Sequence, residues 1–187
     1  ADEGEGVILH DRSGNDNHGE IFHTPWDVGL LNFTSGFQWA EIPNHSKYQS
    51  TAFTIGGWVF SRRESYRRDG MLFIGNSSRG LRLKEKGVVE PIGGSKRVES
   101  MAAEFAIVAR NEWQQVLYTC EADVGKLYVD GMLVQEQTNV ACESDEGSFS
   151  IGSDASWWML HPPESQSLDG TIRDLMLFDR ALSPEEV

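Results

Sequence analysis

Short runs of apolar residues alternate with polar ones along this chain, and no segment keeps a convincing helical spacing. The pattern is clearest in the second half, where Trp113–Cys120 is followed by Lys126–Asp130 and Met132–Gln137. Aromatic and β-branched residues favour strands, and Asp130-Gly131 favours a tight hairpin turn because its central residues need positive φ. The sequence therefore predicts a three-stranded antiparallel meander.

Strand patterns separated by polar turns continue on both sides of this meander. Phe53–Phe60 is the longest of them, and its two glycines predict a bulge or the close approach of a neighbouring backbone. Shorter strands are predicted at Val7–Leu9, Glu20–His23, Leu30–Phe33, Gln38–Ile42, Met71–Ile74, Leu81–Lys84, Met101–Ala109 and Ser148–Gly152. An all-β sandwich or jelly roll follows, with two antiparallel sheets.

The last strand pattern, Gly170–Phe178, breaks its own alternation. Leu175 and Leu177 share one face, whereas Ile172 has the other parity. A bulge near Asp174 would bury all three apolar residues and could re-aim the Asp174 carboxylate. Ser-Pro-Glu-Glu then follows at 183–186, and this order predicts an N-capped helical turn.

Length and composition restrict the range of functions. At 187 residues the chain fits one domain, and 39% hydrophobic residues indicate a folded core. A net charge of −13 argues against nucleic acids and anionic membrane surfaces as partners. No run approaches the roughly 20 apolar residues of a membrane span. The opening ADEGEG does not resemble a signal peptide, so we expect a mature or excised fragment.

The two cysteines, Cys120 and Cys142, lie beyond opposite ends of the meander in sequence. The first and third strands run the same way, so both thiols could meet at one end of the sheet. A disulfide and a pair of buried free thiols both fit this placement. Three Asn-x-Ser/Thr triplets favour secretion only mildly.

Oxygen-bearing side chains fall at 11, 13, 15 and 17 in the loop DRSGNDNHG. A loop folded around a point can aim such alternating groups at a hard cation, which suggests calcium. The loop is not an EF-hand, because its twelfth position is Phe22 rather than a bidentate glutamate. A polar loop built on Asx turns, without metal, explains the same pattern.

Candidate ligand-binding residues lie in two loops. Arg62 and Arg67 belong to a basic loop in an otherwise acidic chain, so they could contact an anion or an acidic sugar, although a solvated loop has the same composition. Trp157 and Trp158 lie in a long loop, where one indole could stack on a sugar while the other caps the core. Arg82 is a weaker candidate. Trp58 is assigned to the core.

Five segments together resemble the LamG-like jelly-roll family, which is part of the concanavalin A-like sandwiches. They are DRSGNDNHG, FTIGGWV, NEWQQVLYTC with GKLYVDGMLV, SIGS, and LDGTIRDLMLFDRALSPEEV, in the family's order. The resemblance implies a concanavalin A-like jelly-roll sandwich as a single domain over residues 1–187, excised from a larger extracellular, multidomain protein.

The resemblance also implies a structural calcium ion where the first loop meets the last strand. Carried over to this chain, its ligands would be the side chains of Asp11 and Asp174, Asn15 by side chain or carbonyl, and main-chain oxygens around His18. Arg173 departs from the family, which often has an acidic residue there. This departure weakens the expected ligand set.

A non-catalytic, lectin-like carbohydrate-binding module, secreted or at the cell surface, is the function we predict. Its partner would be a glycan bound by Trp157, Trp158 and the arginines named above. A protein-binding extracellular adhesion module without a sugar site is the alternative. Catalysis is not expected, because the closely spaced Glu-x-Asp-x-Glu acids of the sandwich glucanases have no match on a strand here.

Overall fold

The computed structural model describes residues 5–34, 38–43, 50–62, 70–75, 79–84, 87–93, 108–142, 147–153 and 168–187. All of its regular elements are strands. They are β1 (Ile8–Leu9), β2 (Gly19–Phe22), β3 (Trp26–Asp27), β4 (Leu30–Phe33), β5 (Trp39–Ile42), β6 (Phe53–Ser61), β7 (Gly70–Gly75), β8 (Arg79–Leu83), β9 (Val89–Gly93), β10 (Trp113–Glu121), β11 (Val124–Val129), β12 (Met132–Thr138), β13 (Phe149–Ile151) and β14 (Gly170–Phe178). Within these residues no helix is long and apolar enough to span a membrane.

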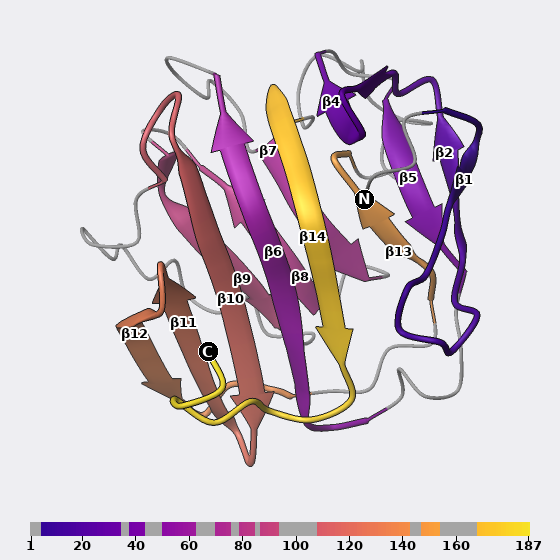
Figure 1. Cartoon of the computed structure of the whole chain (residues 1–187). Coiled ribbons are helices and arrows are strands. Elements are labelled where there is room, and N and C mark those ends of the chain that lie inside the picture. The colour runs from indigo at the N-terminus through magenta and orange to yellow at the C-terminus, as the bar shows by residue number, and fades with distance from the viewer. Residues whose placement is uncertain are drawn as a thin grey trace, which may run out of the picture.

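The strands form two seven-stranded antiparallel sheets that face one another (Figure 1). Sheet A has the order β1-β2-β5-β13-β7-β8-β9, and sheet B has the order β12-β11-β10-β6-β14-β4-β3. Single strands or groups of two or three successive strands alternate between the sheets, and β14 lies between β6 and β4 in sheet B. This is the predicted jelly-roll sandwich.

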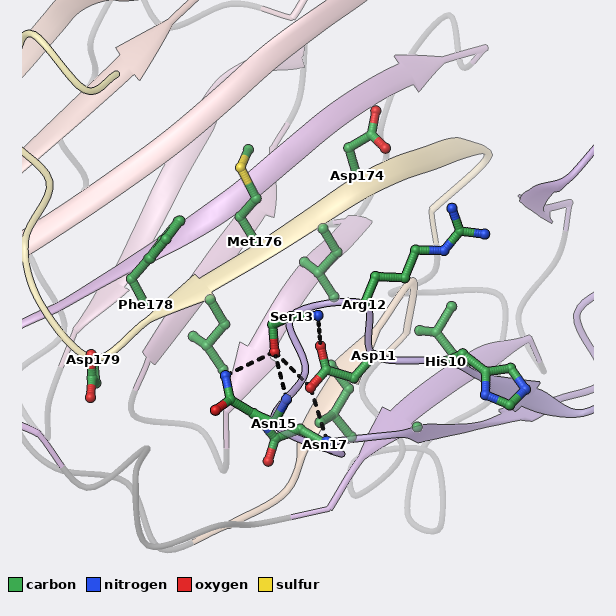
Figure 2. Close-up of a pocket in the computed structure, with 15 residues that line it drawn as sticks. His10, Asp11, Arg12, Ser13, Asn15, Asn17, Asp174, Met176, Phe178 and Asp179 are labelled. Carbon is green, nitrogen blue, oxygen red and sulfur yellow. Dashed lines mark hydrogen bonds between the residues drawn. The ribbon is translucent and has the colours of Figure 1, made fainter. Parts of the chain in front are cut away.

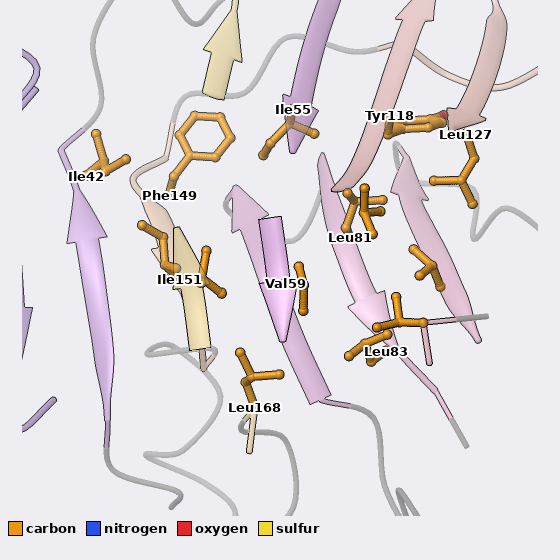
Figure 3. Packing of buried hydrophobic residues seen from close by; sticks show 14 of the residues in the cluster. Ile42, Ile55, Val59, Leu81, Leu83, Tyr118, Leu127, Phe149, Ile151 and Leu168 are labelled. Carbon is orange, nitrogen blue, oxygen red and sulfur yellow. The ribbon is translucent and has the colours of Figure 1, made fainter. Parts of the chain in front are cut away.

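A single apolar core fills the space between the sheets (Figure 3). Sheet A contributes Leu81, Leu83 and Ile151, and sheet B contributes Ile55 and Val59, all at most 2% exposed. These residues follow the two-residue period of a strand, so the alternation that predicted the strands also predicted their inward faces.

The meander is confirmed as β10, β11 and β12, with Asp130 and Gly131 both at positive φ in the turn between the last two strands. The predicted close packing beside Phe53–Ser61 is also confirmed. A Cβ on Gly56 would lie 2.0 Å from the Val116 carbonyl oxygen of β10. Such a contact is impossible, so the backbones of β6 and β10 require glycine at this position.

A disulfide joins Cys120, near the end of β10, to Cys142, beyond the end of β12. The two Cα atoms lie 5.6 Å apart, and both residues belong to the core. Of the two alternatives for these cysteines, the disulfide is therefore the one that the structure contains.

Two short strands were not predicted. Strand β3 begins at Trp26, and the turn that follows it contains Val28 and Gly29 at positive φ. Strand β9 (Val89–Gly93) lies in a stretch that had no clear pattern. Pro91 and the buried charge of Glu90 are unusual in a strand, so the sequence pattern did not indicate one there. The strand predicted at Met101–Ala109 lies almost wholly outside the described residues.

Candidate binding groove beside the last strand

A groove of about 620 Å³ lies between the loop that joins β1 to β2 and the second half of β14 (Figure 2). Among the described residues, β4 pairs with β14 over Gly170–Ile172, so the part of β14 beyond Asp174 borders the groove instead. Leu9, Ile42 and the leucines of β14 make its apolar lining. Its polar lining comes from Asp11, Arg12, Ser13, Asn15, Asn17, Asp174 and Asp179.

The loop closes around the carboxylate of Asp11. Oδ1 accepts a hydrogen bond from the Ser13 amide at 2.8 Å. Oδ2 accepts one from the Ser13 hydroxyl at 2.8 Å and one from the Asn17 amide at 3.0 Å. Gly14 and Asp16 take positive φ, which lets the chain turn back on itself. These contacts form the Asx-turn loop that was the metal-free interpretation of the sequence.

The same contacts set the charge of Asp11. Partial burial raises the pKa of its carboxyl, but the hydrogen bonds from Ser13 and Asn17 and the nearby His18 together hold the pKa below its ordinary value. Asp11 is therefore ionised at neutral pH and presents a fixed negative charge to the groove.

Asp174 occupies the predicted bulge. The pairing of β14 with β6 shifts between Arg173 and Met176, and Asp174 has a φ of 50°. The bulge buries Ile172 and packs Leu175 and Leu177 against the core, as the broken alternation predicted. It also turns the Asp174 carboxylate to the side of β14 that carries Met176 and Phe178, away from Asp11 (Figure 2).

Three of the four candidate calcium ligands line the groove, but the four do not converge on one point. Asp11, Asn15 and Asp174 all line it, whereas Asp174 points outward with Arg173 Nε 3.8 Å from its Oδ2. His18 Nδ1 accepts a hydrogen bond from the Asp11 amide at 2.9 Å. In the described part of the chain, no three His, Cys, Asp or Glu side chains are grouped to hold a metal ion. As placed, these residues do not fit a calcium shared by Asp11 and Asp174.

Arg62 is held by the fold itself. Its guanidinium donates to Asn32 Oδ1 at 2.6 Å, to the Phe33 carbonyl at 2.7 Å, and to Asp169 Oδ1 and Thr171 Oγ1, both at 3.2 Å. These bonds tie the end of β6 to β4 and to the start of β14. Most of its donors are therefore used, and the contacts favour a structural role over the predicted ligand contact.

Arg82 is paired as well. It bonds to Glu90 on the neighbouring strand β9, and Lys84 Nζ lies 3.0 Å from the other oxygen of the same carboxylate. Glu90 is only 3% exposed, so two cations compensate one buried anion. The other predicted ligand residues, Trp157, Trp158 and Arg67, lie outside the described residues.

A group of aromatic residues lies on the outer face of sheet B, which is the face turned away from the core. Trp58 is half-buried there beside Arg173, rather than in the core as predicted. Parity could have shown this, because Phe53, Ile55 and Val59 are the core residues of the same strand and Trp58 alternates with them.

Comparisons with known proteins agree with this architecture. Residues 34–187 match the family model described as the concanavalin A-like lectin/glucanases superfamily. The chain belongs to this superfamily. No curated protein sequence matches the chain.

Solved structures with the same fold include domains of carbohydrate-active enzymes. A Trypanosoma rangeli sialidase in complex with sialic acid superposes with a TM-score of 0.76 and 17% identity, over 100% of this chain and 31% of the sialidase. Domain 4 of AbnA, a GH43 extracellular arabinanase from Geobacillus stearothermophilus, in complex with arabinotriose, superposes with a TM-score of 0.68 and 17% identity, over 95% of this chain and 90% of that domain. At this identity the likeness establishes the fold. This chain spans less than a third of the sialidase's length.

Proposed function

We propose that this chain is a non-catalytic carbohydrate-binding module whose sugar site is the groove between the first loop and β14. The groove carries the proposal, because it combines an apolar lining with carboxylate and amide groups. A sugar ring has apolar faces and a hydroxyl edge, so it can bury the former against leucines while its hydroxyls donate to oxygens. The arabinotriose complex of the AbnA domain supports sugar binding as a use of this fold.

The charge state of Asp11 supports binding rather than hydrolysis. Glycoside hydrolysis generally needs one protonated carboxylic acid beside a second carboxylate. Asp11 accepts three hydrogen bonds from Ser13 and Asn17, and its pKa is lowered instead of raised. An ionised carboxylate of this kind is a poor general acid.

Calcium at the first loop is a separate part of the proposal. Asp11 and Asn15 could supply side-chain oxygens, and main-chain oxygens near His18 could complete a site for a hard cation. Asp174 would have to turn its carboxylate to the other side of β14. A calcium-dependent rise in melting temperature that Asp11→Asn abolishes would support this site, and equal melts in calcium and chelator would refute it.

The proposed location is extracellular. The buried Cys120–Cys142 disulfide supports it, because such bonds persist in oxidising compartments.

A glycan-array screen of the purified chain, run in calcium and in chelator, tests the sugar-binding proposal. Asp179→Asn removes an acceptor from the groove, and Asp27→Asn on β3 makes the same change at an exposed position that is not part of the groove. We expect saturable binding that weakens about tenfold in the first variant and is unchanged in the second. Thermal melts check folding.

Two results would contradict this proposal in different ways. A blank array from folded protein would refute sugar binding and favour the protein-binding adhesion module. Glycan affinity that is unchanged in Asp179→Asn would refute the groove as the binding site but would still support a carbohydrate-binding module.

A further inference from the structure

The outer face of sheet B holds an arginine between two tryptophans. Arg173 on β14 lies directly opposite Trp58 on β6, and its guanidinium carbon is 5.3 Å from the centre of that ring. The same carbon is 4.5 Å from the centre of the Trp113 ring on β10. Both distances are within the range of cation–π contacts, so the two indoles fix the position of the guanidinium on the sheet.

The aromatic contacts extend along the sheet. Phe60 pairs with Trp113 across β6 and β10, with ring centres 5.5 Å apart. This packing holds the Trp113 ring in place under the guanidinium. Trp58, Trp113 and Phe60 thus form a packed aromatic platform, and such packing lowers the entropy lost when a ligand binds.

The Arg173 guanidinium is held by aromatic rings. Its Nε is buried and has no hydrogen-bond partner in the described part of the chain, so a ligand would approach the terminal nitrogens. Asp174 Oδ2 lies 3.8 Å from Nε, which makes an ion pair but is too far for a hydrogen bond. By contrast, Arg62 and Arg180 have their guanidinium groups bonded to carboxylates and carbonyls. The Arg173 side chain is also 38% exposed.

A preorganised guanidinium suits a planar anion. A carboxylate accepts two parallel N–H bonds from such a fork, and charge-assisted bonds of this kind are stronger than neutral ones. We infer that Arg173, held by Trp58 and Trp113, binds the carboxylate of an acidic sugar unit. This inference rests on the proposed function, since the sugar character of the ligand comes from there.

The site complements the groove. Asp174 lines the groove and directly follows Arg173, so the two surfaces adjoin on β14. The groove carries the charge of Asp11 and favours neutral hydroxyl-bearing units, whereas Arg173 favours an acidic unit. A glycan with both kinds of unit, such as an oligosaccharide with a uronic or sialic acid residue, could contact both.

Binding of paired acidic and neutral glycans tests the inference. The probes are oligogalacturonate and its fully methyl-esterified form, together with sialyllactose and lactose, measured by calorimetry at two salt concentrations. We expect the wild-type chain to prefer an acidic member of a pair, and added salt to weaken that preference. Arg173→Met should lower the affinity for the acidic glycan about ten- to hundredfold and leave the neutral one unchanged.

Two further variants distinguish recognition of a carboxylate by the Arg173 guanidinium from the effect of positive charge alone. Arg173→Lys keeps the charge without the fork, so it should retain part of the preference. Arg180→Met removes the same charge near the end of β14, where the guanidinium is already bonded to both Glu186 oxygens. It should leave the acidic preference intact. Thermal melts of all variants report folding.

The outcomes also distinguish this inference from the function on which it rests. A preference for acidic glycans that is lost in Arg173→Met and kept in Arg180→Met supports both. Glycan binding with no acidic preference, or a preference insensitive to Arg173, overturns the inference while the carbohydrate-binding module stands. Absence of binding to any glycan by folded protein overturns both, and Arg173 is then a cation–π contact that only stabilises sheet B.

Discussion

The hydroxyl of Thr54 fastens the C-terminal segment to the outer face of sheet B. Thr54 lies on β6 and is completely buried, because residues after β14 cross the ends of β6 and β10 there (Figure 1). Its Oγ1 donates to the Arg180 carbonyl at 2.9 Å and accepts from the Leu182 amide at 2.9 Å. Thr54→Val keeps the side-chain shape but removes both bonds.

Thr54→Val lowers the free energy of unfolding because the Arg180 carbonyl and the Leu182 amide lose their hydrogen-bond partner. A buried polar group without a partner costs about 1–3 kcal/mol. The Leu182 amide is buried, so the full cost applies to it. The Arg180 carbonyl belongs to an exposed residue and can partly bond to water, so its cost is smaller. We therefore expect a loss of about 2–4 kcal/mol in the free energy of unfolding. For a chain of this size that corresponds to a fall of about 5–15 °C in melting temperature.

Urea unfolding followed by tryptophan fluorescence measures this loss. Thr54→Ser is the matched control, since it keeps the hydroxyl and loses one methyl group, so it should cost about 1 kcal/mol. A valine variant as stable as the wild type would refute the role of the two bonds. A serine variant as unstable as the valine variant would show that packing of the methyl group, rather than hydrogen bonding, holds the segment.

Two further predictions concern stability. Replacing Cys120 and Cys142 by alanine opens a loop with a sequence separation of 22, so the unfolded chain gains entropy worth about 3 kcal/mol, and urea unfolding in the absence of reductant should show a loss of that order. The side-chain hydrogen bond from Arg180 is the main reason why the pKa of Glu186 is lowered to about 2. Because its folded pKa lies below the unfolded one, its contribution is present above about pH 4 and is lost as the pH falls toward 2. Glu186→Gln should flatten that part of the pH–stability curve, and an unchanged acid limb would contradict the prediction.

The strands could be predicted because their signals are local. Alternation predicted the inward faces of the clearer strands, Asp130-Gly131 predicted one hairpin, and Ile172 with Leu175 required a bulge in the last strand. The glutamate of the predicted capping box at 183–186 is confirmed, since the Ser183 amide donates to Glu186 Oε2 at 2.9 Å. Each of these inferences needs only a few neighbouring residues.

The candidate ligand residues could be predicted less well, because their partners are distant in sequence. Nothing near Arg62 indicates that Asn32 and Asp169, far away along the chain, would use its donors. Arg82 is likewise paired by Glu90, on a strand that the pattern did not reveal. An arginine is available to a ligand only when the fold leaves its donors unused, and that depends on the tertiary structure.

The bulge in β14 shows how a correct local prediction can lead to a different site. Burying both Ile172 and Leu175 requires an irregular residue between them, and aspartate tolerates the left-handed region better than arginine. Asp174 takes that conformation, and its carboxylate then faces outward instead of toward Asp11. Burial of the two apolar side chains requires the bulge. The bulge in turn directs the Asp174 carboxylate away from the predicted calcium site and toward the side of Arg173. Arg173, which departs from the family's metal-binding pattern, is the residue that we propose as the contact for an acidic ligand.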